Sequence, residues 1–73
     1  MRVAYVRCIC DVTKPYAIGG ARRIDREFGI RLTDGCDEKT SIQNRLTSEL
    51  IVLTGFRPSG FRLVSPDVWE CTV

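Results

Sequence analysis

The segment Met1–Val12, MRVAYVRCICDV, decides the fold, because its apolar residues alternate at a period of two residues. The even positions from residue 4 onward are all apolar, and they are Ala4, Val6, Cys8, Cys10 and Val12. The odd positions, from Val3 to Asp11, mix apolar and charged side chains. Successive side chains of a strand point to opposite faces of a sheet, so this pattern predicts a strand with one face in the core. We expect the mixed face to be partly covered by a helix or by a partner.

The chain is short and nearly balanced in charge. Its 73 residues predict a single compact domain over residues 1–73. A domain of this size buries only about 60% of the surface that its unfolded chain exposes, so a homodimer would enlarge a thin core. The formal net charge is +2, and arginine is much commoner than lysine. A net charge this small does not by itself indicate a nucleic-acid partner.

Two absences in the sequence exclude whole classes of function. The chain has no histidine, which removes the commonest general base and the commonest metal ligand, so we expect no enzymatic activity, no cofactor and no metal. No apolar run approaches the roughly 20 residues that span a bilayer, and the N-terminus lacks the pattern of a secretory signal. We therefore expect a cytoplasmic protein that is complete from Met1 and makes no membrane contact.

A short helix is predicted over residues 21–28. Ala21, Ile24 and Phe28 follow one another at helical spacing, and Gly29 stands where a glycine often ends a helix. The alternative is an extended arm, because eight residues make a marginal helix without strong packing.

A brief strand over residues 29–33 and a second helix over about residues 37–48 are predicted next. Acidic residues at positions 37 and 38 interact favourably with the positive N-terminal end of the helix dipole. Its apolar stripe consists of Ile42, Leu46 and Leu50. A stripe this narrow predicts a helix that lies on one side of a sheet.

The tripeptide Gly-Phe-Arg occurs twice, at residues 55–57 and 60–62, with Pro58-Ser59 between the copies. Proline and glycine favour a tight turn here, so we predict a hairpin that joins the strands Leu50–Phe56 and Phe61–Ser65. The core face of this hairpin is predicted to consist of Ile51, Leu53, Phe61 and Leu63.

A last strand, Val68–Val73, follows the turn Pro66-Asp67 and carries its apolar residues on one side. These apolar residues are Trp69, Cys71 and Val73. Together the elements predict an α+β fold, a small single-layer sheet of four to five mostly antiparallel strands with one or two short helices packed on one face.

The four cysteines, Cys8, Cys10, Cys36 and Cys71, are interpreted mainly as core residues, because cysteine is among the most buried residue types. A zinc site is the alternative, although the chain lacks the paired Cys-x₂₋₄-Cys spacing of structural zinc sites. Disulfides do not suit a cytosolic chain. Cys36 precedes the predicted second helix, which makes it a candidate redox or labelling site.

The predicted hairpin is the strongest candidate for a binding site. It would present Phe56, Arg57 and Arg62 from a rigid turn, and aromatic and arginine side chains dominate the binding energy of protein interfaces. A purely structural explanation is that each phenylalanine faces an arginine across the hairpin and stiffens it through a cation–π contact.

A nucleic acid is the second partner that these residues suit. A base would stack on Phe56, and phosphates would contact Arg22, Arg23 and Arg26 on the short helix. The three arginines are equally well explained as a solvated helix face that pairs with neighbouring carboxylates.

The sequence therefore favours a small non-catalytic protein-binding module that docks through a Phe/Arg hairpin. Short modules of this size and fold class occur among viral and mobile-element proteins, and by that analogy we expect an inhibitor or adaptor. The alternative is a small nucleic-acid-binding protein that uses the same hairpin and an arginine-rich helix face. Salt dependence of binding separates the two, because phosphate contacts weaken steeply as salt rises.

Overall fold

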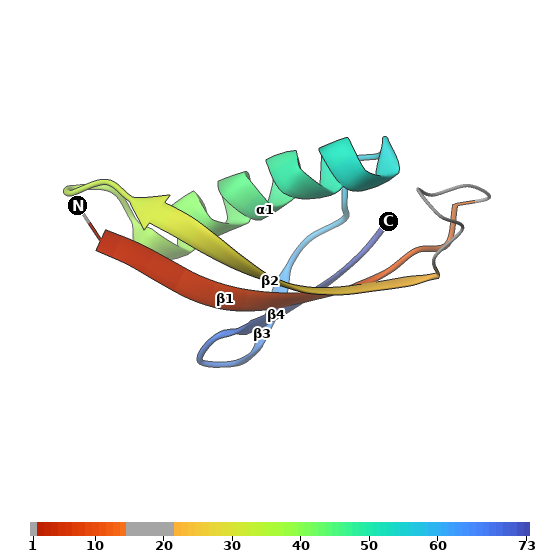
Figure 1. The fold of residues 1–73 in the computed structure, drawn as a ribbon, viewed down its shortest axis with the longest axis horizontal. Helices are drawn as coiled ribbons and strands as arrows, with labels where there is room; N and C mark the ends of the chain where they lie inside the picture. Colours follow the sequence, from red (N-terminus) through yellow and green to blue (C-terminus); the bar gives the residue numbers. More distant parts are fainter. Residues whose placement is uncertain (1, 15–21) are drawn as a thin grey trace.

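The computed structural model describes residues 2–14 and 22–73, and within them four strands form one mixed sheet with a single helix over one face (Figure 1). In chain order the elements are β1 (Arg2–Asp11), β2 (Arg23–Leu32), α1 (Glu38–Thr54), β3 (Arg62–Ser65) and β4 (Val68–Thr72). The strand order is β2-β1-β4-β3. The pairs β1–β2 and β3–β4 are antiparallel, and the pair β1–β4 is parallel. The predicted α+β class is confirmed.

β1 is a central strand, and its even residues lie in the core as their alternation predicts. Val6, Cys8 and Cys10 are all buried beneath α1. β2 pairs with all ten residues of β1, whereas β4 pairs only with the second half, from Arg7 to Asp11. The first half of β1 therefore has a strand on one side only.

The last strand is also confirmed. Pro66 and Asp67 form the turn between β3 and β4. The buried row of β4 side chains extends one residue past the end of the strand, to Val73. Its core residues are Trp69, Cys71 and Val73. Because β4 lies beside β1, this row extends the core formed by the even residues of β1.

The predicted short helix over residues 21–28 is wrong, because residues 23–32 form strand β2. Ala21 lies outside the described residues. The side of β2 that packs against the core consists of Ile24, Phe28, Ile30 and Leu32. A spacing of four residues between Ile24 and Phe28 fits a period of two as well as a helical turn, and the next two core residues continue the period of two. Gly29 therefore ends no helix and lies inside the strand.

α1 begins as predicted but extends past residue 48 to Thr54. Asp37 is the N-cap, and its carboxylate accepts hydrogen bonds from the backbone N–H of Thr40 at 2.9 Å and from the Thr40 hydroxyl at 2.7 Å. These two bonds, led by the hydroxyl, lower the pKa of the Asp37 carboxyl from its usual value. The buried stripe follows the four-residue repeat to the end of the helix, and it consists of Ile42, Leu46, Leu50 and Thr54.

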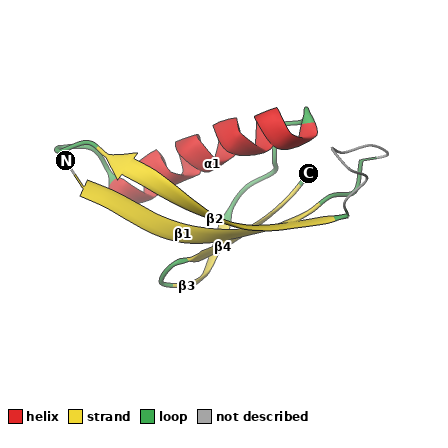
Figure 2. Cartoon of the chain, in the orientation of Figure 1, coloured by secondary structure: helices red, strands yellow, loops and turns green. Residues whose placement is uncertain are grey.

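The predicted hairpin between Leu50–Phe56 and Phe61–Ser65 is wrong, because residues 50–54 belong to α1. Gly55 ends the helix in the left-handed conformation, with φ 80°, and its N–H donates to the carbonyl of Ile51 at 2.7 Å. Residues 55–61 form a loop that leads from α1 to β3 (Figure 2). Of the side chains predicted for the core face of the hairpin, Ile51 and Leu63 are 37% and 38% exposed.

Both ends of this loop are tied to the domain. The buried Thr54 hydroxyl donates to the Leu50 carbonyl at 2.7 Å and accepts from the backbone N–H of Phe56 at 3.1 Å. At the other end, the ring of Phe61 meets Trp69 edge-on with centroids 6.4 Å apart. The two Phe-Arg units therefore begin and end a packed connection.

The two Gly-Phe-Arg copies give opposite predictions for glycine replacement. Gly55→Ala should lower the free energy of unfolding by about 1–2 kcal/mol, because Gly55 needs the left-handed region. Gly60→Ala should change it by less than about 0.5 kcal/mol, since Gly60 has no positive φ and its added Cβ would meet open space. Urea unfolding of both variants measures the difference. If Gly60→Ala lowered the free energy of unfolding more than Gly55→Ala does, the result would favour the predicted hairpin over the observed loop.

Candidate functional site

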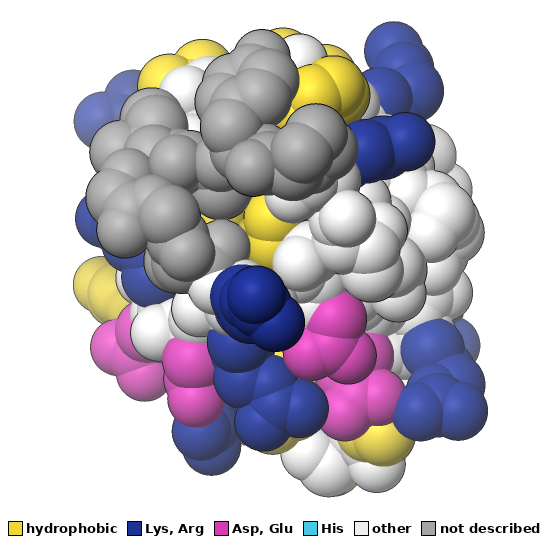
Figure 3. All heavy atoms as spheres, turned by 90° about the vertical axis from the view of Figure 1, so that its right-hand side faces the viewer, with side chains coloured by type: hydrophobic (Ala, Val, Ile, Leu, Met, Phe, Trp, Pro, Cys, Tyr) yellow, Lys and Arg dark blue, Asp and Glu magenta, His cyan; other side chains and the backbone are white. Residues whose placement is uncertain are grey.

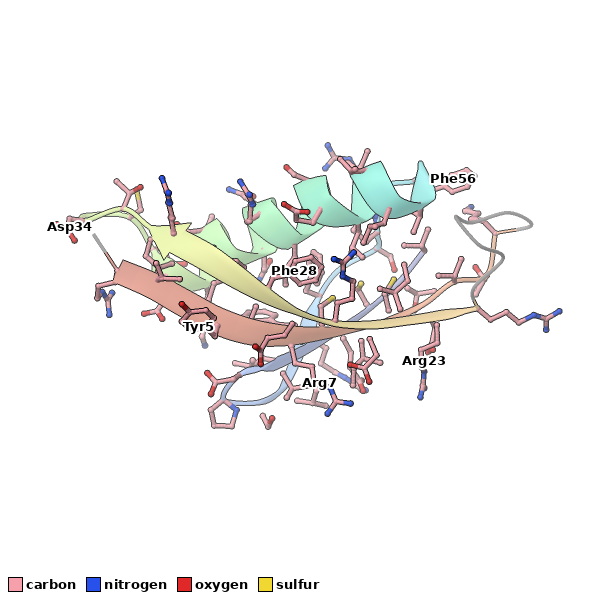
Figure 4. All side chains as sticks on the ribbon, in the orientation of Figure 1. Tyr5, Arg7, Arg23, Phe28, Asp34 and Phe56 are labelled. Atoms are coloured by element: carbon pink, nitrogen blue, oxygen red, sulfur yellow. The ribbon has the colours of Figure 1, made fainter. Side chains whose placement is uncertain are left out.

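The structure places the three residues predicted to bind a protein partner in the loop after α1 and at the start of β3. Phe56 lies beyond the C-terminal end of α1 (Figure 4), half-buried against the core, with the Lys14 ammonium 5.7 Å from its ring centroid. Arg57 is exposed in the loop. Arg62 lies on β3 and donates to the Glu70 carboxylate at 2.6 Å. No hairpin presents these side chains together, and their part in binding stays a prediction.

The three arginines predicted for phosphate contacts share no helix face. Arg22 is exposed just before β2. Arg23 and Arg26 are three positions apart in β2, so their side chains leave opposite faces of the strand. The guanidinium of Arg26 lies 5.6 Å from the centroid of the Phe28 ring, which is on the core side. These arginines form no continuous basic stripe.

The sheet face opposite α1 has no helix over it in the described part of the chain, and three of its arginines lie against carboxylates. Arg7 and Arg23 point away from α1 in Figure 4. The ion pairs are Arg7–Asp25 at 2.5 Å, Arg23–Asp11 at 3.2 Å and Arg62–Glu70 at 2.6 Å. Figure 3 shows basic and acidic side chains next to one another at one end of the molecule. In each of these three pairs the charges of the arginine and the carboxylate cancel, so the pairs add no net charge to this open face.

A shallow hollow of ≈ 230 Å³ lies on the open face, floored by Ile9 and bordered by two of these ion pairs. It brings together Arg23 and Arg62, which the sequence assigned to two different sites. Asp11 and Glu70 already pair with these two guanidinium groups. A phosphate in the hollow would therefore have to compete with a carboxylate for either arginine. The geometry does not favour a phosphate site.

Tyr5 is the large aromatic residue of the open face, and it is 67% exposed. It stands opposite Gly29 in the register of β1 and β2. A Cβ built on Gly29 would lie 3.3 Å from the Tyr5 ring, so the ring covers the glycine. An aromatic ring that packs across a strand glycine stabilises a sheet. This packing accounts for the side of the Tyr5 ring that contacts Gly29, and the other side is exposed to solvent.

The cysteines behave mainly as predicted. Cys8, Cys10 and Cys71 are buried in the core, and Cys36 is exposed. Burial raises the pKa of the Cys10 thiol, which keeps it protonated. Within residues 2–14 and 22–73, no group of three or more cysteines and carboxylates is arranged to hold a metal ion.

The first half of β1 has an unpaired edge on the side where β4 lies further along. The Arg7 N–H donates to the Asp67 carbonyl at 2.8 Å and the Asp11 carbonyl accepts from Val73 at 2.9 Å, so odd residues of β1 direct their backbone groups toward β4. By the same alternation, Val3 and Tyr5 direct their N–H and C=O groups to this side. β4 begins only opposite Arg7, and no described strand reaches these four groups.

A groove of ≈ 500 Å³ runs beside this edge on the helix side of the sheet. Its apolar lining comes from four elements and from the turn before β4, and it consists of Ala4, Val6, Ile42, Leu63, Pro66 and Trp69. Its rim carries Asp37, Glu38, Lys39 and Asp67. The combination of an apolar lining, a charged rim and unpaired backbone makes this groove the best-formed candidate site in the described residues.

Sequence reasoning missed the groove, although it had predicted most of the apolar residues that line it as core. The mixed odd face of the first strand was expected to be partly covered by a helix or by a partner, and α1 covers the other face. The available signal in the sequence was the pair of apolar residues Val3 and Tyr5 on that mixed face, and both are exposed in the structure. Their meaning depends on where β4 begins, which is a long-range property.

Comparison with known proteins gives no match, whether with protein-family models, with curated proteins or with solved structures. No helix in the described part of the chain is long and apolar enough to cross a membrane. The site must therefore be interpreted from its own geometry.

The Arg7–Asp25 pair predicts a pH dependence of stability. The hydrogen bond from Arg7 lowers the pKa of the Asp25 carboxyl, so the unfolded chain takes up this proton first as the pH falls. The stabilisation by the pair is therefore present above the unfolded pKa of about 3.9 and is lost as the pH falls below it. Urea unfolding should show wild type more stable than Asp25→Asn at neutral pH, with the gap closing in acid. A gap that stays constant in acid would contradict this role.

Proposed function

We propose that this chain is a small non-catalytic protein-binding module, of the kind that acts as an inhibitor or adaptor by occupying a surface of another protein. The single observation that carries the proposal is the apolar groove beside the unpaired edge of β1. The absence of histidine from the whole chain supports a role in recognition rather than in acid–base chemistry.

Exposed apolar side chains beside the groove support a protein partner. Leu63, which lines the groove, is 38% exposed. Val3 and Tyr5, on the open face of the same stretch of β1, are 48% and 67% exposed. Contiguous exposed apolar surface with a polar rim is typical of protein interaction sites. A partner would bury this surface and add to the thin core of a small domain.

The paired arginines favour a protein over a nucleic acid. Non-specific binding to nucleic acid draws its energy from lysines and arginines that neutralise phosphates. On the open face, Arg7, Arg23 and Arg62 each lie against a carboxylate of the same chain. A phosphate would have to displace these carboxylates.

The experiment is to capture a partner from nuclease-treated lysate, purify it separately and measure its affinity for the wild type over a range of salt. We expect the affinity to fall by less than about tenfold between 50 and 200 mM salt, where contacts to 6–10 phosphates would lose about 10³–10⁵. Leu63→Ser in the groove should weaken binding, and Val52→Ser, which changes a 75% exposed residue of α1, should not.

Two results would contradict the proposed function. One is a partner that is captured from untreated lysate but not from nuclease-treated lysate, or a complex whose affinity falls with salt as steeply as that of a phosphate-driven complex. The other is equal affinity of the Leu63→Ser and Val52→Ser variants for the purified partner. Circular dichroism of both variants checks that neither change alters the fold.

A further inference from the structure

We propose that the partner binds as an added β-strand along residues 2–6 of β1, through an extended segment with alternating apolar side chains and a lysine or arginine placed against Asp67. This inference rests on the proposed function and names the chemistry of the segment that would fill the groove. Strand addition to an exposed sheet edge is an established mode of peptide recognition.

The backbone of β1 supplies four groups for such a strand. The N–H and C=O groups of Val3 and Tyr5 point to the side where β4 is absent, and Arg7 is the first residue whose N–H has a partner there, the Asp67 carbonyl at 2.8 Å. An added strand would stand in line with β4 and continue the sheet. Its backbone would satisfy the four free groups of the edge.

Both faces of an added strand would meet apolar surface. Side chains on the helix side would enter the groove beside Ala4, Ile42 and Trp69. Side chains on the open side would lie beside Val3 and Tyr5, which are 48% and 67% exposed. The groove therefore selects apolar residues at alternate positions of the bound segment, and the residues between them would lie over the exposed side chains of Val3 and Tyr5.

The outer edge of β2 provides a contrast. β2 has β1 on one side only, and its charged residues are Arg23, Asp25, Arg26, Glu27 and Arg31. Charged side chains along an edge are a common protection against pairing with another chain. Positions 3–6 of β1 carry none. The edge of β2 thus carries charged side chains that the beginning of β1 lacks.

Charge at the rim of the groove indicates a basic segment. The rim has three carboxylates, Asp37, Glu38 and Asp67, against the single ammonium of Lys39. Glu38 is partly matched by Arg2 at 3.7 Å, and Asp67 forms no ion pair with another described residue. A lysine or arginine of the partner beside Asp67 would complete the pairing at that end of the edge.

The test uses the full chain and a displayed library of random dodecapeptides. The most enriched peptide is synthesised, and its affinity is measured by fluorescence polarisation for the wild type and for two charge-reversal variants. Asp67→Lys lies on the groove rim, and Glu27→Lys on β2 makes the same change of charge away from the groove. Single N-methyl groups are also placed in turn on each amide of the peptide.

We expect enriched peptides with alternating apolar residues and a lysine or arginine, and a loss of about tenfold or more with Asp67→Lys but not with Glu27→Lys. N-methylation should weaken binding at alternate amides only, because every second N–H of an added strand faces β1. A peptide that binds through a helix or a loop would not give this alternation.

Three results would overturn the inference. The first is an enriched peptide whose affinity does not change with Asp67→Lys, or whose affinity does not fall at alternate N-methylated amides. Such a peptide would bind at another site, and the proposed protein-binding function would remain. The second is a library that yields no enriched peptide. The third is sedimentation showing that a second copy of the chain occupies the edge and excludes the peptide, since the occupant would then be the chain itself. Failure of the proposed function is recognised separately, from the salt and Leu63→Ser measurements.

Discussion

The structure depends on one constraint: β1 is the only strand that contacts both β2 and β4, so its pairing holds the two hairpin-like halves of the described chain together. Its even residues supply the middle of the core, and α1 covers them from one side. A core this small leaves no room for a second interior layer. The opposite face of the sheet is therefore left open in the described part of the chain and is stabilised by ion pairs at its surface.

The candidate site follows from the different lengths of the strands that flank β1. β2 has ten residues and matches β1 throughout, whereas β4 has five and begins after the turn at Pro66 and Asp67. That turn places the N-terminal end of β4 halfway along β1 and leaves the beginning of β1 unpaired. The start of α1 passes over the same region and forms the other wall of the groove. Edge and groove thus have one structural origin.

The parts of the fold that the sequence predicted correctly are those that local periodicity determines. β1 and β4 alternate strictly, so their core residues could be assigned without tertiary information. The first half of β2 was missed because Ile24 and Phe28 suit both a helix and a strand, whereas the brief strand predicted over residues 29–33 overlaps its second half. The end of α1 was missed because the apolar run from Leu50 to Leu53 looks like a strand, although Leu50 and Thr54 continue the helical stripe. The groove needed the register between β1 and β4, which no local pattern encodes.

Amide hydrogen exchange of the free protein, followed residue by residue by NMR, tests most directly whether the edge of β1 is unpaired. The backbone N–H groups of Ala4 and Val6 face β2 and should exchange slowly, whereas those of Val3 and Tyr5 should exchange fast. Slow exchange at Val3 and Tyr5, equal to that at Arg7, would show that the edge is already covered and would contradict the description of the site.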